Sequence, residues 1–221
     1  MSVSTTYRLQ ICGQHLILHP FRAVYWEEQN SLLIADLHLG KAAHFRRTGI
    51  AVPAAVGDAN LDKLISLLLD YQPDRVLFLG DLFHSEYNNQ WIAFCELLDQ
   101  FSGIHFELVR GNHDVLDESF YERAGLEVHA EVLEIGPFLL THHPLTELSK
   151  EELYNLAGHI HPAVSLRGGG RQRLRLPCFF FGKHQGLLPA FGEFTGLASQ
   201  SVGPDDRVFA IAEDAILAIK E

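Results

Sequence analysis

The sequence is poor in cysteine and lacks any long apolar run. Its 221 residues include only three cysteines, Cys12, Cys95 and Cys178. Their odd number and wide spacing argue against a disulfide framework and against a zinc-finger pattern. No stretch approaches the roughly 18 apolar residues that a membrane-spanning helix needs, and MSVSTTYRLQICG at the start has no signal-peptide character. These absences predict a bacterial-type cytoplasmic protein with no membrane segment.

Basic residues are also scarce. The chain has 17 Lys and Arg against 28 Asp and Glu, a formal net charge of −11, which counts against a surface built for general nucleic-acid binding. Some of the acidic groups can instead be metal ligands, because a bound divalent cation neutralises nearby carboxylates. Histidine, by contrast, is abundant with 13 copies, and it is the commonest transition-metal ligand and a frequent acid–base group.

Apolar runs and helical patterns alternate in the first part of the chain, and strand patterns follow. Periodicity predicts helices at 53–72 and 89–101. It predicts strands or hairpins at 31–36, 74–81, 104–112, 136–144, 153–161, 172–182 and 206–220. This order predicts an α/β protein in which two sheets pack together with helices outside. The length fits a single domain, 1–221, with a well-buried core.

Metal-capable side chains follow five of the predicted strands at the point where each strand ends. They are Asp36, Asp81, Asn112, His142 and His159. Ligands of open α/β sheets gather at the carboxyl ends of the strands. One such residue would be an ordinary start of a loop, but five at five strand ends predict one shared site.

Two short motifs add further candidate ligands. Asp36 and His38 in ADLHLG, and His159 and His161 in GHIH, are each two residues apart. Alternate residues of a strand point to the same face, so each pair could address one ion. Taken alone, GHIH fits an ordinary strand better than a metal site. Oxygen and imidazole ligands without cysteine favour Mn²⁺, Fe or Zn²⁺ over an iron–sulfur cluster.

The ordered set DLH, GD, GNHD, a strand ending in histidine, and GHIH resembles the calcineurin-like metallophosphoesterase superfamily. The resemblance implies a four-layer α-β-β-α sandwich and two divalent metal ions. Mn²⁺ is the preferred ion, and Fe or Zn²⁺ are the alternatives. The resemblance also implies that Asp81 bridges the two ions. It implies a first metal held by Asp36, His38 and His161, and a second held by Asn112, His142 and His159.

The same resemblance assigns His113 to the substrate phosphate without making it a ligand. Two cations about 3.5–4 Å apart supply a nucleophile and stabilise charge on the attacking and leaving oxygens of a phosphodiester. His113 can then protonate the leaving oxygen or stabilise charge on the phosphoryl group. The sequence does not choose between these two roles.

Other histidines near the motifs are interpreted individually. His84, in GDLFH, stands where the superfamily often has aspartate, and we interpret it as support for a neighbouring ligand. His143 follows a predicted ligand and either supports the site, contacts substrate or faces away. His44 is a candidate to reach the site from the first loop. Histidines without a motif, including His19, are interpreted as structural or surface residues.

Two further stretches narrow the resemblance. DLHLGKAAHFRRTGIAVP at 36–53 and LLPAFGEFTG at 187–196, with GDLFHS and GHIHP, resemble the ligase-associated DNA damage response endonuclease subfamily, PdeM. This implies a metal-dependent endonuclease or phosphodiesterase acting on DNA, single-stranded or at ends. It also implies a role in DNA repair beside a DNA ligase, a helicase and an exonuclease.

Arginines cluster after the first and the last of the metal motifs. Arg46 and Arg47 follow the first, and Arg171 and Arg173 lie in RQRLRL after the last, with Arg175 on the same strand face. Both clusters are candidates for contact with nucleic-acid phosphates. The alternative for RQRLRL is a solvated hairpin face.

Two other functions remain compatible with the motifs. The same chemistry could act on a nucleotide or another small phosphoester. A non-catalytic scaffold of the same fold would be expected to have lost ligands, whereas all seven predicted ligands and His113 are present. The sequence therefore favours an enzyme.

Overall fold

The computed structural model describes residues 5–41, 55–84, 88–150, 152–167, 173–193 and 195–221. Arg46, Arg47, Arg171 and His44 lie outside these ranges. None of the described helices is long and apolar enough to cross a membrane.

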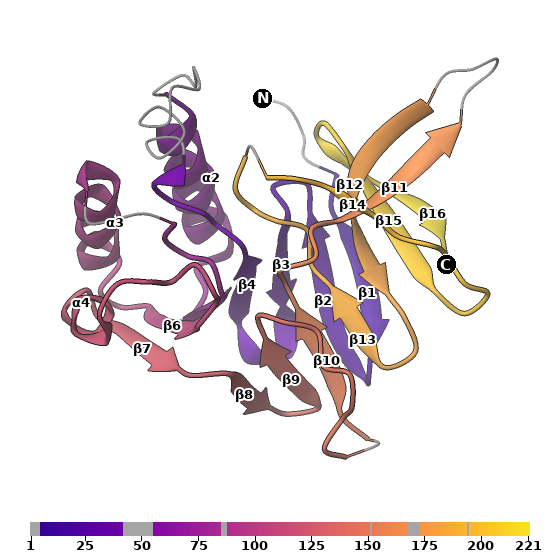
Figure 1. The fold of residues 1–221 in the computed structure, drawn as a ribbon, viewed down its shortest axis with the longest axis horizontal. Helices are drawn as coiled ribbons and strands as arrows, with labels where there is room; N and C mark the ends of the chain where they lie inside the picture. Colours follow the sequence, from indigo (N-terminus) through magenta and orange to yellow (C-terminus); the bar gives the residue numbers. More distant parts are fainter. Residues whose placement is uncertain (1–4, 42–54, 85–87, 151, 168–172, 194) are drawn as a thin grey trace.

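The first sheet has seven strands in the order of the chain (Figure 1). They are β1 (Tyr7–Ile11), β2 (Gln14–His19), β3 (Ala23–Trp26), β4 (Ser31–Ala35), β5 (Arg75–Leu79), β6 (His105–Val109) and β7 (Leu126–His129). The strands from β1 to β4 are antiparallel, and those from β4 to β7 are parallel. The short 3₁₀ helix η1 (Glu27–Gln29) links β3 to β4.

Helices cover one face of this sheet. They are α2 (Ala55–Tyr71), α3 (Asn89–Gln100) and α4 (Glu118–Arg123). The Asn88 side chain caps α3 by accepting hydrogen bonds from the backbone N–H groups of Gln90 and Trp91. Fully buried Leu64, Phe78 and Phe94 belong to the core that joins the helices to the sheet.

The second sheet has nine strands. They are β8 (Val132–Ile135), β9 (Phe138–Thr141), β10 (Tyr154–Ala157), β11 (Pro162–Arg167), β12 (Arg173–Phe181), β13 (Gln185–Leu187), β14 (Ala198–Ser199), β15 (Arg207–Ala212) and β16 (Ala215–Lys220). The order is β14-β11-β12-β13-β10-β9-β8, and β15 pairs with β12 and β16. Strand β10 runs parallel to both β9 and β13.

The second core lies between the two sheets. Leu77 and Val109 of the first sheet and Phe138, Phe179 and Phe181 of the second belong to it, and all are buried. Burying such side chains contributes roughly 1.5–3 kcal/mol each. This core fixes how the two sheets stack, and with them the strand ends that carry the predicted ligands.

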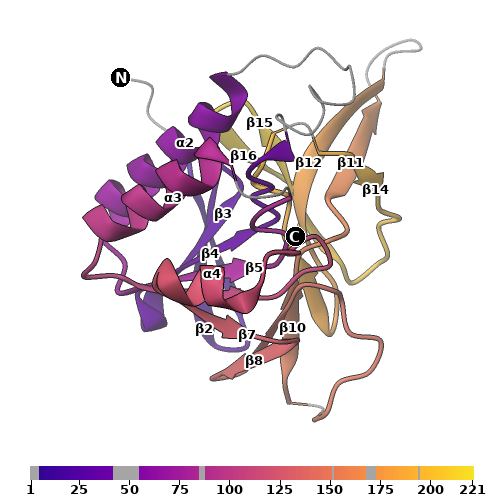
Figure 2. The same ribbon diagram turned by 60° about the vertical axis from the view of Figure 1, so that its left-hand side comes forward.

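The α/β class with two stacked sheets is confirmed. Figure 2 shows α2, α3 and α4 together on the side of the first sheet, with loops along the opposite side of the sandwich. The two sheets and one outer layer of helices match the predicted sandwich. Within the described part of the chain, helices cover only the outer face of the first sheet. On the side of the second sheet, the chain after β9 continues as a loop without helix at 144–150.

Eight of the sixteen described strands and both long helices fall where periodicity predicts them, but the first hairpin was not predicted. Strands β1 and β2 join through Cys12 and Gly13, whose φ angles are 49° and 77°. Two positive φ angles in a two-residue loop are typical of a type I′ hairpin turn. The alternating apolar positions on both sides of this Cys-Gly pair were the available signal. The segment from α4 to β8 was also not predicted.

Candidate metal centre

The predicted ligands meet at one edge of the sandwich. Asp36 directly follows β4, and His142 directly follows β9. Asp81 lies two residues after β5, Asn112 three after β6 and His159 two after β10. Because β4, β5 and β6 are parallel to one another and β9 is parallel to β10, their carboxyl ends share an edge in each sheet.

The expected strand geometry of the paired residues is wrong. Strand β10 ends at Ala157, so His159 and His161 lie in the loop that connects it to β11. Asp36 and His38 likewise lie in the loop after β4. Both pairs still converge, but a turning backbone brings them together, not the alternation of a strand.

The backbone at these positions is unusual. Of ten described non-glycine residues with positive φ, five are predicted ligands: Asp36, His38, Asp81, His159 and His161, with φ between 48° and 64°. A left-handed conformation is unfavourable for residues with a Cβ, and such residues cluster at functional sites. The surrounding packing must hold these five side chains in place.

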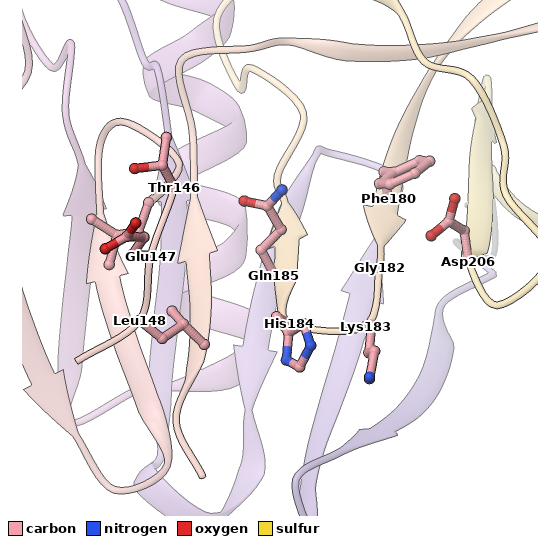
Figure 3. A pocket seen from close by; sticks show the side chains of 10 residues that line it. Thr146, Glu147, Leu148, Phe180, Gly182, Lys183, His184, Gln185 and Asp206 are labelled. Atoms are coloured by element: carbon pink, nitrogen blue, oxygen red, sulfur yellow. The ribbon is translucent and has the colours of Figure 1, made fainter. Parts of the chain in front are cut away.

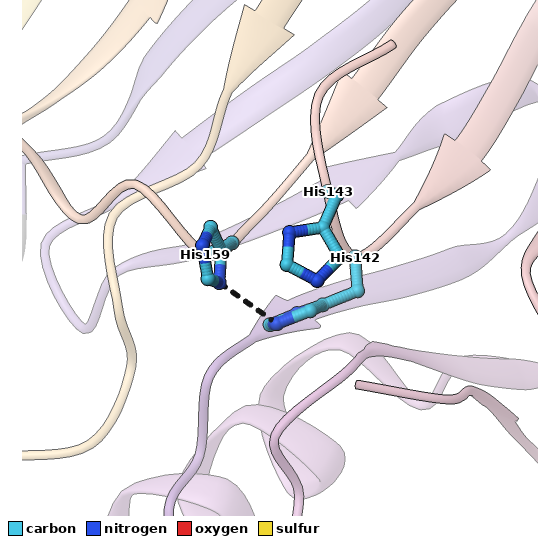
Figure 4. Close-up of side chains that lie close together, drawn as sticks. All are labelled: His142, His143 and His159. Carbon is cyan, nitrogen blue, oxygen red and sulfur yellow. Dashed lines mark hydrogen bonds between the residues drawn. The ribbon is translucent and has the colours of Figure 1, made fainter. Parts of the chain in front are cut away.

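The second group consists of Asn112, His142 and His159. His142 Nε2 lies 3.1 Å from His159 Nδ1 (Figure 4). It also lies 3.0 Å from Asn112 Oδ1 and 3.4 Å from Asp81 Oδ1. Ligand atoms about 2.0–2.1 Å from a common ion lie about 3.0–3.4 Å from each other. His142 Nδ1 lies 3.1 Å from the carbonyl oxygen of Leu79. Donation of the Nδ1–H to that oxygen leaves Nε2 free for a metal.

The first group consists of Asp36, His38 and His161, whose ligand atoms all lie within 4.8 Å of one another. Asp36 Oδ1 and His161 Nε2 are 3.5 Å apart. Asp36 Oδ1 and both ring nitrogens of His38 are buried without a hydrogen-bond partner. Buried polar atoms are rarely left without a partner in folded proteins, and a divalent cation would satisfy both residues.

Asp81 lies between the two groups with one carboxylate oxygen directed to each. Its Oδ1 is 3.4 Å from His142 Nε2, and its Oδ2 is 3.8 Å from His38 Nε2. Oδ1 also accepts a hydrogen bond from the backbone N–H of His113 at 2.9 Å. This arrangement fits a carboxylate shared by two ions.

Burial favours the neutral form of the His38 and His159 imidazoles, which is the form that binds metal. Burial lowers the pKa of His38 to about 2. It also lowers the pKa of His159, with neighbouring His143 acting in the same direction. These side chains therefore present lone pairs at neutral pH.

Two glycines allow the ligands to pack closely. Gly80 has a φ of 73°, and a Cβ there would overlap the His142 imidazole. A Cβ on Gly158 would lie 2.6 Å from Asp36 Oδ2. The glycines of the GD and GHIH motifs thus leave room for a ligand side chain of another strand.

His113 and His84 form a pair beside the first group. His113 is exposed, and its ring centroid lies 3.9 Å from that of His84 and 6.0 Å from that of His38. The ring of His84 in turn lies 5.4 Å from that of His38. His84 therefore packs between a predicted ligand and the predicted phosphate-side histidine, as its interpretation as a supporting residue requires.

His143 lies beside the second group. Its ring centroid is 4.0 Å from that of His159 and 4.6 Å from that of His142 (Figure 4). Its ligand atom lies within 4.8 Å of those of both neighbours. His143 is exposed and does not turn away from the site.

Sequence reasoning missed two charged residues at the centre. Asp114 is buried and accepts hydrogen bonds from the backbone N–H groups of Gly111 and Phe83, and burial raises its pKa to about 6. Burial lowers the pKa of Lys41, and the negative charges of Asp81 and Asp36 act in the opposite direction. The available signals were the last letter of GNHD and the lysine of DLHLGK.

The LLPAFGEFTG stretch packs directly against the first group. The backbone N–H groups of Phe191 and Gly192 donate to the carbonyl oxygens of Ala35 and Asp36. Phe191 is fully buried, so it packs the core, and Phe194 lies outside the described residues. The carbonyl oxygen of Gly196 lies 3.1 Å from His161 Nδ1.

Arg173 is exposed on the hairpin of β11 and β12, which extends past the rest of the second sheet in Figure 1. Strand β12 is antiparallel to β13, and β13 is parallel to β10. The start of β12 therefore lies towards the same edge as the predicted ligands. By strand alternation, Arg173 and Arg175 share the side of Phe179, which faces the first sheet.

A cavity of about 940 Å³ lies elsewhere. Lys183, His184 and Gln185 at the start of β13 line it together with Asp206 (Figure 3). It shares no residue with the predicted ligands, and it lies at the opposite end of β13 from the metal edge. Despite its size, this cavity is therefore not the candidate metal site.

Comparison with known proteins agrees with this geometry. The chain is similar to the nuclease MPE of Pseudomonas putida, with 28% identity and a TM-score of 0.79 over 97% of this chain and 100% of that chain. It is less similar to Yfce, a phosphoesterase from E. coli, with 14% identity and a TM-score of 0.45 over 85% and 96% of the two chains. A protein of unknown function from Aquifex aeolicus has 18% identity and a TM-score of 0.43 over 64% and 82%.

A search of the curated proteins found no match. The calcineurin-like phosphoesterase family matches residues 30–182, more than half of the chain and including all seven predicted ligands. The protein belongs to the calcineurin-like phosphoesterase family and is a metal-dependent hydrolase.

Proposed function

We propose that the protein is a dinuclear-metal phosphodiesterase that cleaves DNA. The observation that carries the proposal is the position of Asp81 between two groups of ligand atoms at one edge of the sandwich, with Asp36, His38 and His142 buried. Each group offers the oxygen and imidazole atoms that a divalent cation takes. We assign the first metal to Asp36, His38 and His161, and the second to Asn112, His142 and His159, with Asp81 bridging.

The chain's own groups have distinct tasks in this reaction. When bound, the two ions supply a nucleophile and stabilise charge on the reacting oxygens. His113, exposed beside the first group, reaches the phosphate or its leaving oxygen. His84 holds the His113 ring in position through their contact. Lys41 adds positive charge near the phosphate.

DNA is the favoured substrate for two reasons. One structural neighbour, which matches over 97% of this chain, is a nuclease. The hairpin that carries Arg173 and Arg175 lies towards the predicted metal edge, where arginines can contact the phosphates on either side of the scissile bond. The rest of this acidic surface would repel a polyanion, so these arginines have a local role.

The activity is tested with bis-p-nitrophenyl phosphate and added Mn²⁺, the ion that we propose. Asp81→Asn keeps the acceptor for the His113 N–H but removes the charge shared by the two groups. We expect hydrolysis to fall at least about a thousandfold, because charge stabilisation by both ions is disturbed. Asp99→Asn, an equal charge change at an exposed position of α3, should behave like the wild type.

The substrate class is tested by comparing single-stranded DNA with nucleotides at equal phosphate concentration. DNA cleavage that disappears in Asp81→Asn supports the proposal. Good turnover of a nucleotide without any DNA cleavage would replace it with a small-substrate phosphoesterase. A wild type that hydrolyses neither, yet binds metal, would indicate a scaffold.

The placement of this activity in DNA repair, beside a DNA ligase, a helicase and an exonuclease, rests on the sequence resemblance alone. We keep it as part of the proposal, and co-purification of such partners from cells is its test. Recovery of none of the three would remove this part and leave the hydrolase unaffected.

A further inference from the structure

A cleft of about 360 Å³ opens beside the second group. We call it the flank cleft. Asn112 and His142 border it, and its other lining residues include Ala130, Val132, Thr141, His143 and Leu145. Its volume is at the lower end of the range for small-molecule sites, about 300–1,000 Å³, and suits one nucleoside.

The chemistry of the lining favours an uncharged group over a phosphate. Val132 on β8 is 43% exposed, and Leu145 and Ala130 add further apolar surface. Glu131 is exposed at the same cleft and would repel an anion. Arg110 also lines the cleft, but its guanidinium donates to the carbonyl oxygens of Asp114 and Leu116.

The wall made by the loop after β9 is held rigidly. Asn155 is fully buried, and its side chain accepts from the backbone N–H of Leu145 and donates to Thr141 Oγ1. Thr141 Oγ1 in turn donates to the carbonyl oxygen of His143 at 2.7 Å. A ligand therefore meets a preformed wall, which lowers the ordering cost of binding.

His143 joins the cleft to the second group. Figure 4 shows its ring between the metal-side imidazoles and the loop that follows. The ring is exposed and contacts His159 at a centroid distance of 4.0 Å. An exposed aromatic ring beside a reacting phosphate is a platform on which a base can stack.

We propose that the flank cleft binds the nucleobase next to the scissile phosphate, on the side of the second group. This inference rests on the proposed function and adds a direction to it. In the second sheet β11 and β12 lie on one side of β10, and β9 and β8, which line the flank cleft, lie on the other. Because β10 leads into His159 and His161, the arginine hairpin and the flank cleft lie on opposite sides of the predicted metals. The DNA strand thus runs from the hairpin, across the two groups, to the cleft.

Chromogenic diesters test the cleft without DNA. The substrates are the 5′- and 3′-p-nitrophenyl phosphates of thymidine, and methyl p-nitrophenyl phosphate, which carries no nucleoside. We expect the wild type to prefer one thymidine ester over the methyl ester by about tenfold in kcat/KM, mainly through KM, as one stacked base provides. No preference for either thymidine ester would overturn the inference.

Variants then locate the preference. Val132→Trp fills the cleft and should reduce the preference to about twofold or less, whereas Val202→Trp, at a comparably exposed valine outside the cleft, should keep it. His143→Ala should reduce the preference, and His143→Phe should restore it by keeping a ring. Circular dichroism and thermal melting check the fold of each variant.

The outcomes separate the two proposals. A preference unchanged by Val132→Trp and His143→Ala overturns the flank cleft while leaving a phosphodiesterase in place. Failure of the metal-loaded wild type to hydrolyse any of the three diesters overturns the proposed function and this inference together.

Discussion

At the scale of single residues, the predicted ligands combine suitable chemistry with an unfavourable backbone. The position after an apolar run or a glycine predicted Asp36, Asp81 and His159 as ligands. It could not predict that all three adopt positive φ angles. It also could not place His84 and His143 against their neighbours, because those contacts join residues far apart in the chain.

The two histidines of GHIH should serve different ions. His161→Ala removes an atom 3.5 Å from Asp36 Oδ1, and His159→Ala removes one 3.1 Å from His142 Nε2. We expect each variant to retain about one of the two Mn²⁺ ions. Metal analysis gives the number, and anomalous scattering from crystals shows which group keeps the ion. Loss of the same ion in both variants would contradict the assignment.

His19, which has no motif around it, should make stability depend on pH. Burial lowers its pKa to about 4, and its Nδ1 accepts a hydrogen bond from the backbone N–H of Phe21. Because the unfolded chain protonates this histidine near pH 6.5 and the native state does not, stability is present above pH 6.5 and decreases as pH falls towards 4.

This dependence is measured by denaturant unfolding of wild type and His19→Asn, which keeps an acceptor but does not titrate. Between pH 7 and pH 5 the wild type should lose about 2 kcal/mol more unfolding free energy than the variant. Equal losses in the two proteins would show that His19 does not cause the effect.

At the scale of elements, the strand ends position the site. Apolar runs predicted β4, β5 and β6 closely, because a buried parallel strand is apolar along its whole length. The shorter and partly exposed β7 and β8 lack such a run and were missed. The loops that carry the ligands have no periodicity, so the conformation of His159 and His161 could not be predicted.

Gly80 links a strand end to a ligand. In Gly80→Ala the new Cβ would overlap the His142 imidazole, and in Gly125→Ala, with a similar φ of 79°, nothing lies within 4 Å. We expect Gly125→Ala to cost about 1–2 kcal/mol for its backbone conformation. Gly80→Ala should cost more and should also lose the second metal. Unfolding curves and metal content measure both, and equal behaviour of the two variants would contradict this role of Gly80.

The hairpin of β11 and β12 should affect DNA more than small esters. Arg173→Glu with Arg175→Glu should weaken DNA cleavage by tenfold or more at low salt and make the salt dependence shallower, since each lost phosphate contact removes about 0.7 from the slope for a single strand. Arg8→Glu, a charge reversal on β1, is the control. Equal losses on DNA and on bis-p-nitrophenyl phosphate would mean that the hairpin is structural.

At the scale of the whole molecule, the sandwich brings distant parts of the chain to one edge. The alternation of strands and helices predicted two sheets, but the order β14-β11-β12-β13-β10-β9-β8 depends on pairings between distant segments. Such pairings depend on tertiary packing, not on local pattern. The family motifs supplied what periodicity could not, namely which strand ends meet.

Cleavage of circular single-stranded DNA tests the central claim most directly, because a circle has no end and only an endonuclease can open it. With Mn²⁺, the wild type should convert circles to linear fragments, and Asp81→Asn should leave them intact under the same conditions. Circles that stay intact with a wild type that hydrolyses bis-p-nitrophenyl phosphate would contradict the account and point to a small phosphoester as the substrate.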